Sequence, residues 1–239
     1  MKAWQGEGAD GATPVEGRIV PRWRRALARA IAVLPTNGMR VIGYRLAGHT
    51  LPRGTRIGWG TVIACTRLCA GKGVVVGRGN RFTGPFTIDI GDHVLIGRHN
   101  RFDCGDIAAD PSKASMAYAR RMVVGARALI HERHFFDIYG AIAIGAGTWV
   151  AGCDSQFWTH GASAMDRDIT IGADCYLGSA VRMAPGSAIP DRCVLGLGSV
   201  VVSRLEQPDS VLAGFPARFL RPVSPQDARA FQFTMDGWA

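Results

Sequence analysis

The feature that most constrains the fold is a strict six-residue repeat in the C-terminal half of the chain. A β-strand would show a period of two and an α-helix a period of 3.6, so a period of six fits neither. It predicts a chain that forms a short strand, turns a corner and repeats. Three such units close a triangular coil of 18 residues, and coils stack through parallel strand pairing. Without a slip, aliphatic or methionine side chains recur at Ile171, Leu177, Met183, Ile189, Leu195 and Val201.

The same register continues upstream and predicts about six or seven coils. Two long segments interrupt the repeat, at residues 105–122 and 157–170. Long loops in a solenoid are either decoration or part of a site, and both interpretations remain open here. The upstream inward positions are Ile57 and Ile63, then Val76, Phe82 and Ile88, then Ile90, Ile96 and Phe102, then Val124, Ile130 and Phe136, then Ile144 and Val150, with Gln156 as an off-pattern third position.

The chain divides into four predicted parts: a disordered N-terminus (1–17), a helical cap (18–55), a β-helix (56–204) and a C-terminal extension (205–239). A helix is expected over 21–34, with Trp23, Leu27, Ala30, Ile31 and Leu34 on one face. A second short helix is expected over 39–47. The basic helix either contacts a membrane surface or packs against the end of the β-helix, and we favour packing.

Composition limits the partners and the compartment. The net charge of +9 comes from 25 arginines and three lysines, and such a field attracts CoA, nucleotide sugars or anionic membranes. The basic residues form no RNA- or DNA-binding motif, so no nucleic acid partner is expected. Cys175 and Cys193 are 18 residues apart and occupy the same inward position in successive coils, which predicts free thiols. With no secretory signal or apolar run of transmembrane length, we expect a cytoplasmic protein.

An ordered set of motifs over residues 76–221, strongest from Ile142 onward, carries a family resemblance. It consists of Ile171-Gly172, Leu177-Gly178-Ser179-Ala180-Val181, Leu195-Gly196-Leu197-Gly198-Ser199-Val200-Val201-Val202-Ser203-Arg204 and Ala213-Gly214-Phe215-Pro216-Ala217-Arg218-Phe219-Leu220-Arg221. In this order the motifs resemble the hexapeptide-repeat acyltransferases, which include galactoside and maltose acetyltransferases and polysaccharide O-acetyltransferases. The resemblance implies an all-β fold, a left-handed parallel β-helix with a short N-terminal helical extension. It also implies a homotrimer with sites between subunits.

The resemblance implies that His160 is the catalytic general base. It lies in Ser155-Gln156-Phe157-Trp158-Thr159-His160-Gly161, where Gly161 replaces the proline of the family. An imidazole that titrates near neutrality suits removal of a hydroxyl proton. The group that orients the ring is left open among Asp154, Asp103, Asp106 and a backbone carbonyl.

The resemblance also implies acetyl-CoA as co-substrate and a carbohydrate as acceptor. Asn100 and Asp154 are of interest for the acceptor because both fall at an inward position usually given to small apolar residues. The residues expected to bind the acceptor are Asn100, Asp103, Asp154 and Trp158. Those expected to bind acetyl-CoA are Ser179, Leu197, Ser199, Arg204, Pro216, Arg218 and Arg221.

The leading prediction is therefore a direct-transfer O-acetyltransferase that acts on a sugar or polysaccharide hydroxyl. N-acetylation of an amino sugar is the nearest alternative. A γ-carbonic-anhydrase-like metalloenzyme and a non-catalytic trimeric scaffold are the less favoured ones. No metal site is expected, because the spacing of His131 and His134 is too common to imply one.

Overall fold

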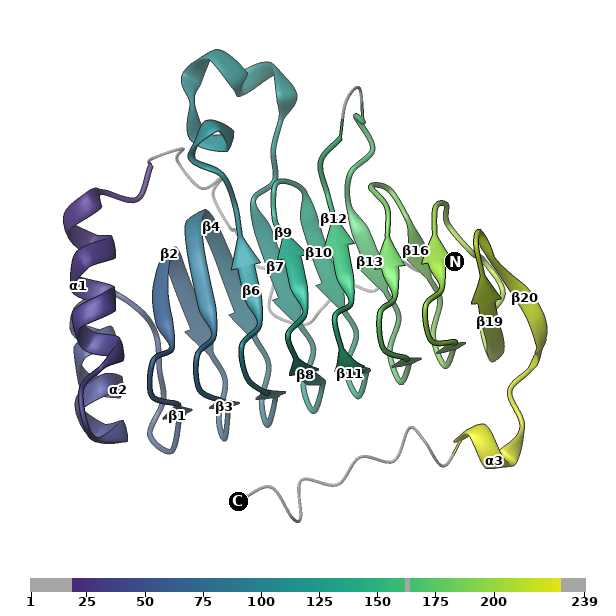
Figure 1. Cartoon of the computed structure of the whole chain (residues 1–239), viewed down its shortest axis with the longest axis horizontal. Helices are drawn as coiled ribbons and strands as arrows, with labels where there is room; N and C mark the ends of the chain where they lie inside the picture. Colours follow the sequence, from purple (N-terminus) through teal and green to yellow (C-terminus); the bar gives the residue numbers. More distant parts are fainter. Residues whose placement is uncertain (1–18, 162–163, 229–239) are drawn as a thin grey trace.

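In the computed structural model, residues 19–161 and 164–228 are described, and they form a stack of coils with helices at its N-terminal end (Figure 1). The helices are α1 (Arg22–Ala32), α2 (Asn37–Leu46) and α3 (Pro225–Ala228), with 3-10 helices η1 (Asp106–Ala109) and η2 (Pro111–Met116). The predicted disordered segment 1–17 lies outside the described residues, as does 229–239 of the predicted C-terminal extension.

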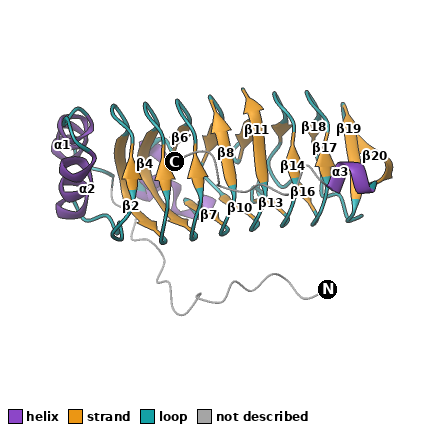
Figure 2. Ribbon diagram, turned by 90° about the horizontal axis from the view of Figure 1, so that it is seen from below, coloured by secondary structure: helices purple, strands orange, loops and turns teal. Residues whose placement is uncertain are grey.

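Short parallel strands build the stack, and they run side by side along its length (Figure 2). One sheet contains, in spatial order, β1 (Arg56–Ile57), β3 (Val75–Val76), β5 (Leu95–Ile96), β8 (Leu129–Glu132), β11 (Trp149–Cys153), β14 (Tyr176–Leu177), β17 (Val194–Leu195), β19 (Ser210–Gly214) and β20 (Ala217–Pro222). The other contains β16 (Ala188–Ile189), β13 (Ile169–Ile171), β10 (Ala141–Ile144), β7 (Arg121–Val124), β4 (Arg81–Ile90), β6 (Arg101–Asp103), β9 (Phe135–Asp137), β12 (Gln156–Trp158), β15 (Arg182–Met183) and β18 (Val200–Val201), with β2 (Val62–Ala70) also paired to β4.

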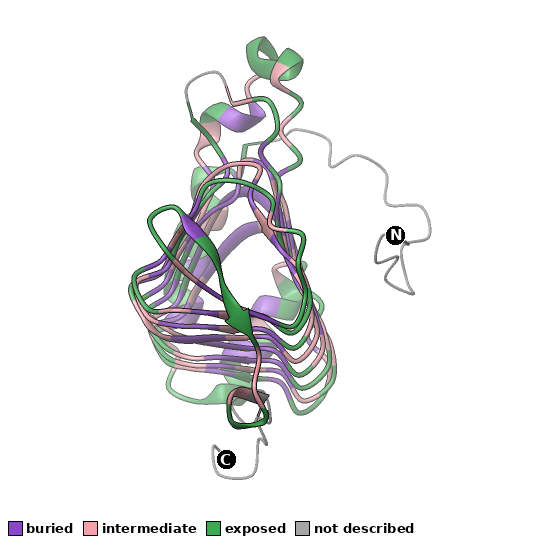
Figure 3. Cartoon of the chain, turned by 90° about the vertical axis from the view of Figure 1, so that its right-hand side faces the viewer, coloured by how far each residue is buried: buried purple, intermediate pink, exposed green. Residues whose placement is uncertain are grey.

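Strand β4 joins two sides of a triangle, because its first half pairs with β6 and its second half with β7. Seen from the end, the coils outline this triangle around a buried interior (Figure 3). The strand pairs are parallel except for the antiparallel β19 and β20. The predicted fold class, an all-β left-handed parallel β-helix with a helical extension, is confirmed.

The inward side chains form columns of like residues. Phe82, Phe102, Phe136 and Phe157 are fully buried, and the centroids of successive rings are 4.4, 4.7 and 4.6 Å apart in stacked geometry. Such columns arise because residues paired in parallel register point the same way. The repeated aliphatic positions from Ile171 to Val201 are likewise buried.

One inward position differs from the expectation. The register shifts between Val150 and Cys153, where Gly152 has a φ of 63°, so this coil holds one extra residue. Phe157 therefore takes the inward position predicted for Gln156 and pairs with Phe136 and Met183.

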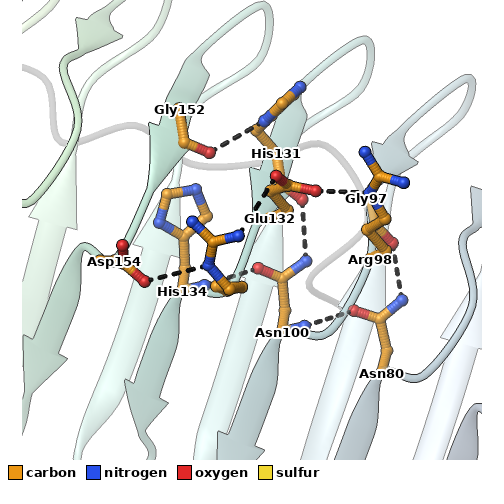
Figure 4. Close-up of polar contacts among 10 residues, drawn as sticks. Asn80, Gly97, Arg98, Asn100, His131, Glu132, His134, Gly152 and Asp154 are labelled. Atoms are coloured by element: carbon orange, nitrogen blue, oxygen red, sulfur yellow. Dashed lines mark hydrogen bonds and ion pairs between the residues drawn. The ribbon is translucent and has the colours of Figure 1, made fainter.

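A ladder of polar side chains lines one inner corner (Figure 4). The Oδ1 of Asn80 accepts the backbone N–H of Asn100 at 2.9 Å, and the Oδ1 of Asn100 accepts that of His134 at 2.9 Å. The Nδ1 of His134 accepts the N–H of Ser155 at 3.1 Å. Each of these side chains is buried and accepts a backbone N–H of the next coil. At a corner the strand pairing is interrupted, so without these side chains the N–H groups would have no partner.

The N-terminal helices pack on the first coil. The α1 face in contact consists of Ala28, Ile31 and Ala32, whereas Trp23 is 65% and Leu27 41% exposed. The prediction that Trp23, Leu27 and Ala30 belong to the packed face is therefore wrong, whereas Ile31 and Leu34 do contact the core. The small Ala28 and Ala32 allow the helix to approach the coil closely, and the backbone N–H of Gly60 donates to the carbonyl of Ala32 at 2.8 Å.

All six cysteines are free thiols. Burial raises the pKa of Cys175 to about 12, which suits its place in the core beside Cys193. Across 19–161 and 164–228, no helix is long and apolar enough to cross a membrane.

We predict that His134 makes stability depend on pH. Burial lowers the pKa of His134 to about 4, whereas an unfolded histidine has a pKa of about 6.5. Between these two pH values the unfolded chain binds a proton at His134 and the folded chain does not. Stability should therefore fall as the pH drops from 6.5 towards 4. His134→Asn keeps an acceptor for Ser155, as Asn100 does one coil earlier, and should reduce this loss by roughly 2–3 kcal/mol in urea unfolding at pH 7 and pH 4.5.

His99→Asn is the matched control, since His99 lies in an exposed turn with a φ of 59° that asparagine tolerates. The buried His49, whose pKa is also about 4, accounts for the dependence that should remain in His134→Asn. Parallel pH profiles for wild type and His134→Asn would contradict the prediction.

Candidate functional site

The candidate site centres on a histidine and a buried carboxylate from successive coils. His160 follows β12, and its Nδ1 lies 2.7 Å from the Oδ2 of Asp137 at the end of β9. The Asp137 side chain is 5% exposed and that of His160 is 44% exposed. One edge of the imidazole is thus fixed by the protein, and the ring remains accessible from outside.

Backbone and side-chain hydrogen bonds fix this pair. The same Oδ2 of Asp137 accepts the backbone N–H of Thr159 at 2.9 Å and that of His160 at 3.1 Å. The Thr159 hydroxyl donates to the carbonyl of Asp137 and accepts the N–H of Tyr139 and of Gly140, each at 2.9 Å. Because the carboxylate is an acceptor in all its contacts, Nδ1 of the neutral ring carries the proton and Nε2 keeps a lone pair.

Two aromatic rings lie beside His160. The ring of Tyr139 lies 4.3 Å from that of His160 between centroids, and the ring of Trp158 lies 6.5 Å away. Trp158 donates from Nε1 to Gln156 Oε1 at 3.2 Å and is 37% exposed. Burial raises the pKa of Tyr139, so its phenol stays protonated near neutrality. The site is thus an aromatic surface that contains Nε2 of His160 as a proton acceptor.

The two segments that interrupt the repeat meet beside this site. They project from the same edge of the stack (Figure 1). Arg167 is buried, donates to the carbonyl of Met116 at 2.8 Å, and places its guanidinium 4.8 Å from the centre of the Tyr118 ring. Tyr118 in turn contacts Tyr139 at 5.1 Å. These contacts link both segments to the surroundings of His160.

The partner of His160 differs from the four groups considered from sequence. Asp103 pairs with Arg101 at 2.7 Å, Asp154 lies 3.4 Å from Arg133, and Asp106 forms an ion pair with Arg25. The missed residue is Asp137. Asp137 pairs with Trp158 because Phe136 pairs with Phe157. The sequence repeat without the one-residue bulge does not give this register, so it does not place Asp137 near His160.

The predicted acceptor residues do not all come together. Trp158 lies beside His160, and Asp103 is the register neighbour of Asp137 in the preceding coil. Asp154 does not point inward as predicted, because the bulge gives that position to Ser155. It is exposed, in a turn with a φ of 63° that precedes β12, whereas His160 follows the other end of that strand.

The acceptor role predicted for Asn100 is wrong. Its side chain is fully buried, its Oδ1 accepts from His134 and its Nδ2 donates to the carbonyl of His131 at 2.9 Å. No polar atom of the side chain faces solvent. The residue belongs to the corner ladder, where it joins successive coils.

The residues predicted for acetyl-CoA lie near the C-terminal end of the stack. Leu197 is 77% exposed, and Pro216 and Arg218 are exposed in the β19–β20 hairpin. Ser179 is half-buried, Arg204 pairs with Asp166 at 3.2 Å, and Arg221 pairs with Asp227 at 2.6 Å. Exposed apolar and cationic groups in one region suit a ligand with an apolar arm and phosphates.

Ser199 does not fit that region. It is buried, its Oγ donates to the carbonyl of Gly196 at 2.7 Å, and the same Oγ accepts the N–H of Gly214 at 3.3 Å. Its predicted contact with acetyl-CoA is therefore corrected to a structural role that holds the hairpin to the last coil. Among the described residues, no group of three or more histidine, cysteine or acidic side chains could hold a metal ion.

We predict opposite tautomers for two histidines of this chain. Neutral His160 should carry its proton on Nδ1, because Asp137 accepts there, whereas His134 should carry it on Nε2, because its Nδ1 accepts from Ser155. Long-range ¹⁵N–¹H NMR spectra of the imidazoles distinguish the two forms, and His134 serves as the internal control. A proton on Nε2 of neutral His160 would contradict the proposed arrangement.

Known proteins are similar to this chain in its fold and in one segment of its sequence. No family model matches the chain. A segment of 59 residues, 25% of this chain, is 41% identical to galactoside O-acetyltransferase of Escherichia coli (strain K12) and covers 29% of that enzyme. The chain thus spans less than a third of the length of the curated relative it matches.

Two solved structures share the architecture. The polysialic acid O-acetyltransferase OatWY aligns with a TM-score of 0.53 and 17% identity, over 73% of this chain and 84% of that one. LpxA from Acinetobacter baumannii aligns with a TM-score of 0.50 and 13% identity, over 79% and 75%. At these identities the likeness shows the fold. The fold is therefore that of the hexapeptide-repeat β-helix proteins, and the predicted resemblance to their acyltransferases is confirmed by the matched 59-residue segment.

Proposed function

We propose that this protein is an acyltransferase that moves an acetyl group from acetyl-CoA to a sugar or polysaccharide hydroxyl. The observation that carries the proposal is the Asp137–His160 pair, in which a buried carboxylate holds Nδ1 and leaves Nε2 open beside the exposed Trp158. The partial match to galactoside O-acetyltransferase supports the same chemistry.

In the proposed mechanism, Nε2 of His160 takes the proton of the acceptor hydroxyl as its oxygen bonds to the thioester carbonyl carbon. The carbon–sulfur bond then breaks, and the departing thiolate takes the proton from Nε2, which returns the ring to its starting form. Asp137 stabilises the transient imidazolium and keeps the ring oriented through both transfers. An amine acceptor could use the same pair, so N-acetylation of an amino sugar is the alternative.

We further propose where the other molecules bind. Acetyl-CoA, the acyl donor, would contact Leu197, Ser179 and Pro216. The exposed Arg218 would meet a phosphate, with Arg204 and Arg221 held nearby by their acidic partners. We propose a homotrimer with sites between subunits, in the cytoplasm. The exposed Trp23 and Leu27 on the basic α1 favour, as a second proposal, contact with an anionic membrane surface.

The test is acetyl-CoA binding and acceptor-dependent CoA release for wild type, His160→Ala and Asp137→Asn, with a panel of sugars and amino sugars. We expect His160→Ala to bind acetyl-CoA normally and to lose about 10²–10⁴-fold in acceptor-stimulated release. Asp137→Asn should lose part of that rate, because it removes the charge that stabilises the imidazolium.

His99→Asn is the control, as an exposed histidine in a turn away from the dyad. The proposal fails if wild type binds no acetyl-CoA, or if His160→Ala keeps the wild-type rate. The acceptor that supports release distinguishes a hydroxyl from an amine.

A further inference from the structure

A column of side chains runs across the outer face of five successive strands next to the site. The residues are neighbours in parallel register, exposed or half-buried, and strands in such a ladder lie about 4.8 Å apart. We call them the arginine column: Arg81 in β4, Arg101 in β6, Phe135 in β9, Gln156 in β12 and Arg182 in β15.

The column is connected to His160 by a path of rings. The Trp158 centroid lies 6.5 Å from that of His160, and the Phe135 centroid lies 4.8 Å from that of Trp158. The guanidinium carbon of Arg101 lies 5.2 Å from the centre of the Phe135 ring. An extended molecule with one hydroxyl at His160 would therefore pass over aromatic faces and meet a guanidinium.

The column has an excess of positive charge. Arg101 pairs with Asp103 at 2.7 Å, and within the described part of the chain no carboxylate forms an ion pair with Arg81 or Arg182. Arg81 and Arg101 are direct register neighbours, and like charges placed opposite one another on a sheet destabilise it. A bound anion would relieve this repulsion, and a guanidinium binds carboxylate or phosphate in bidentate geometry.

We propose that the acceptor is an acidic saccharide, whose carboxylate or phosphate group binds the arginine column while a hydroxyl of a neighbouring unit reaches His160. This inference rests on the proposed function and names its acceptor class. Trp158 and Phe135 stack on the sugar rings, and Arg101 and Arg182, on either side of these rings in the column, each hold a charged group of the saccharide.

The test compares binding of three probes: an oligosaccharide that alternates glucuronic acid and N-acetylglucosamine, maltohexaose as a neutral oligomer, and UDP-N-acetylglucosamine as a phosphate-bearing sugar. Wild type should bind at least one charged probe ten or more times more tightly than maltohexaose, and added salt should reduce the difference. The charged probe that is preferred identifies carboxylate or phosphate as the anion.

The double variant Arg101→Gln/Arg182→Gln should lose this preference, and Arg53→Gln, an exposed arginine of the cap region, should keep it. Equal affinity for charged and neutral probes, or an unchanged preference in the double variant, would overturn the inference.

Because His160→Ala should bind the charged probe as wild type does, binding and transfer are separable. Transfer to neutral sugars without charge preference would reject only the acidic acceptor. Charge-selective binding without any transfer would reject the proposed function, and the arginine column would then be a saccharide-binding surface without an acceptor role.

Discussion

Parallel hydrogen bonding between successive coils is the interaction on which the rest of this structure depends. At one corner, for example, the N–H of Gly77 donates to the carbonyl of Ile96, and the N–H of Gly97 to that of Ile130, each at 2.7 Å. A glycine is required there, since a Cβ on Gly77 would lie 2.3 Å from the carbonyl oxygen of Gly97. Each coil must therefore repeat the cross-section of its neighbour, and this requirement produces the columns of stacked phenylalanines and the ladder of buried amides.

The same requirement explains how the chain builds a site on a regular scaffold. Extra residues have no place inside a coil, so they leave it as a bulge or as a loop. The bulge at Gly152 and the two projecting segments are the main departures from the repeat, and each affects the surroundings of His160. Coil pairing then sets Asp137 beside His160 with a buried carboxylate and several backbone donors, which is a more rigid support than a loop alone could supply.

Much of the fold was predictable because the six-residue spacing, which is visible in a short segment, defines the cross-section of every coil. The inward positions from Ile171 to Val201 and the stacking of Cys175 on Cys193 follow from spacing alone. Spacing alone did not predict the roles of Asp154, Asn100 and Ser199 correctly. The bulge moved Asp154 from an inward position to a turn, and burial assigned the polar groups of Asn100 and Ser199 to the protein itself.

By itself the sequence determined the period, and with it the triangular coil, the direction of the repeated side chains, the free thiols and the place of His160 at the end of a coil. Only the tertiary structure decided which carboxylate meets that histidine, which arginines share a face with it, and which face of α1 packs on the stack. The physical reason is that spacing defines positions within one coil, whereas contacts between coils depend on every inserted residue along the way. A single bulge at Gly152 changes which side chains become neighbours, and nothing in the local sequence marks it as strongly as the repeat itself.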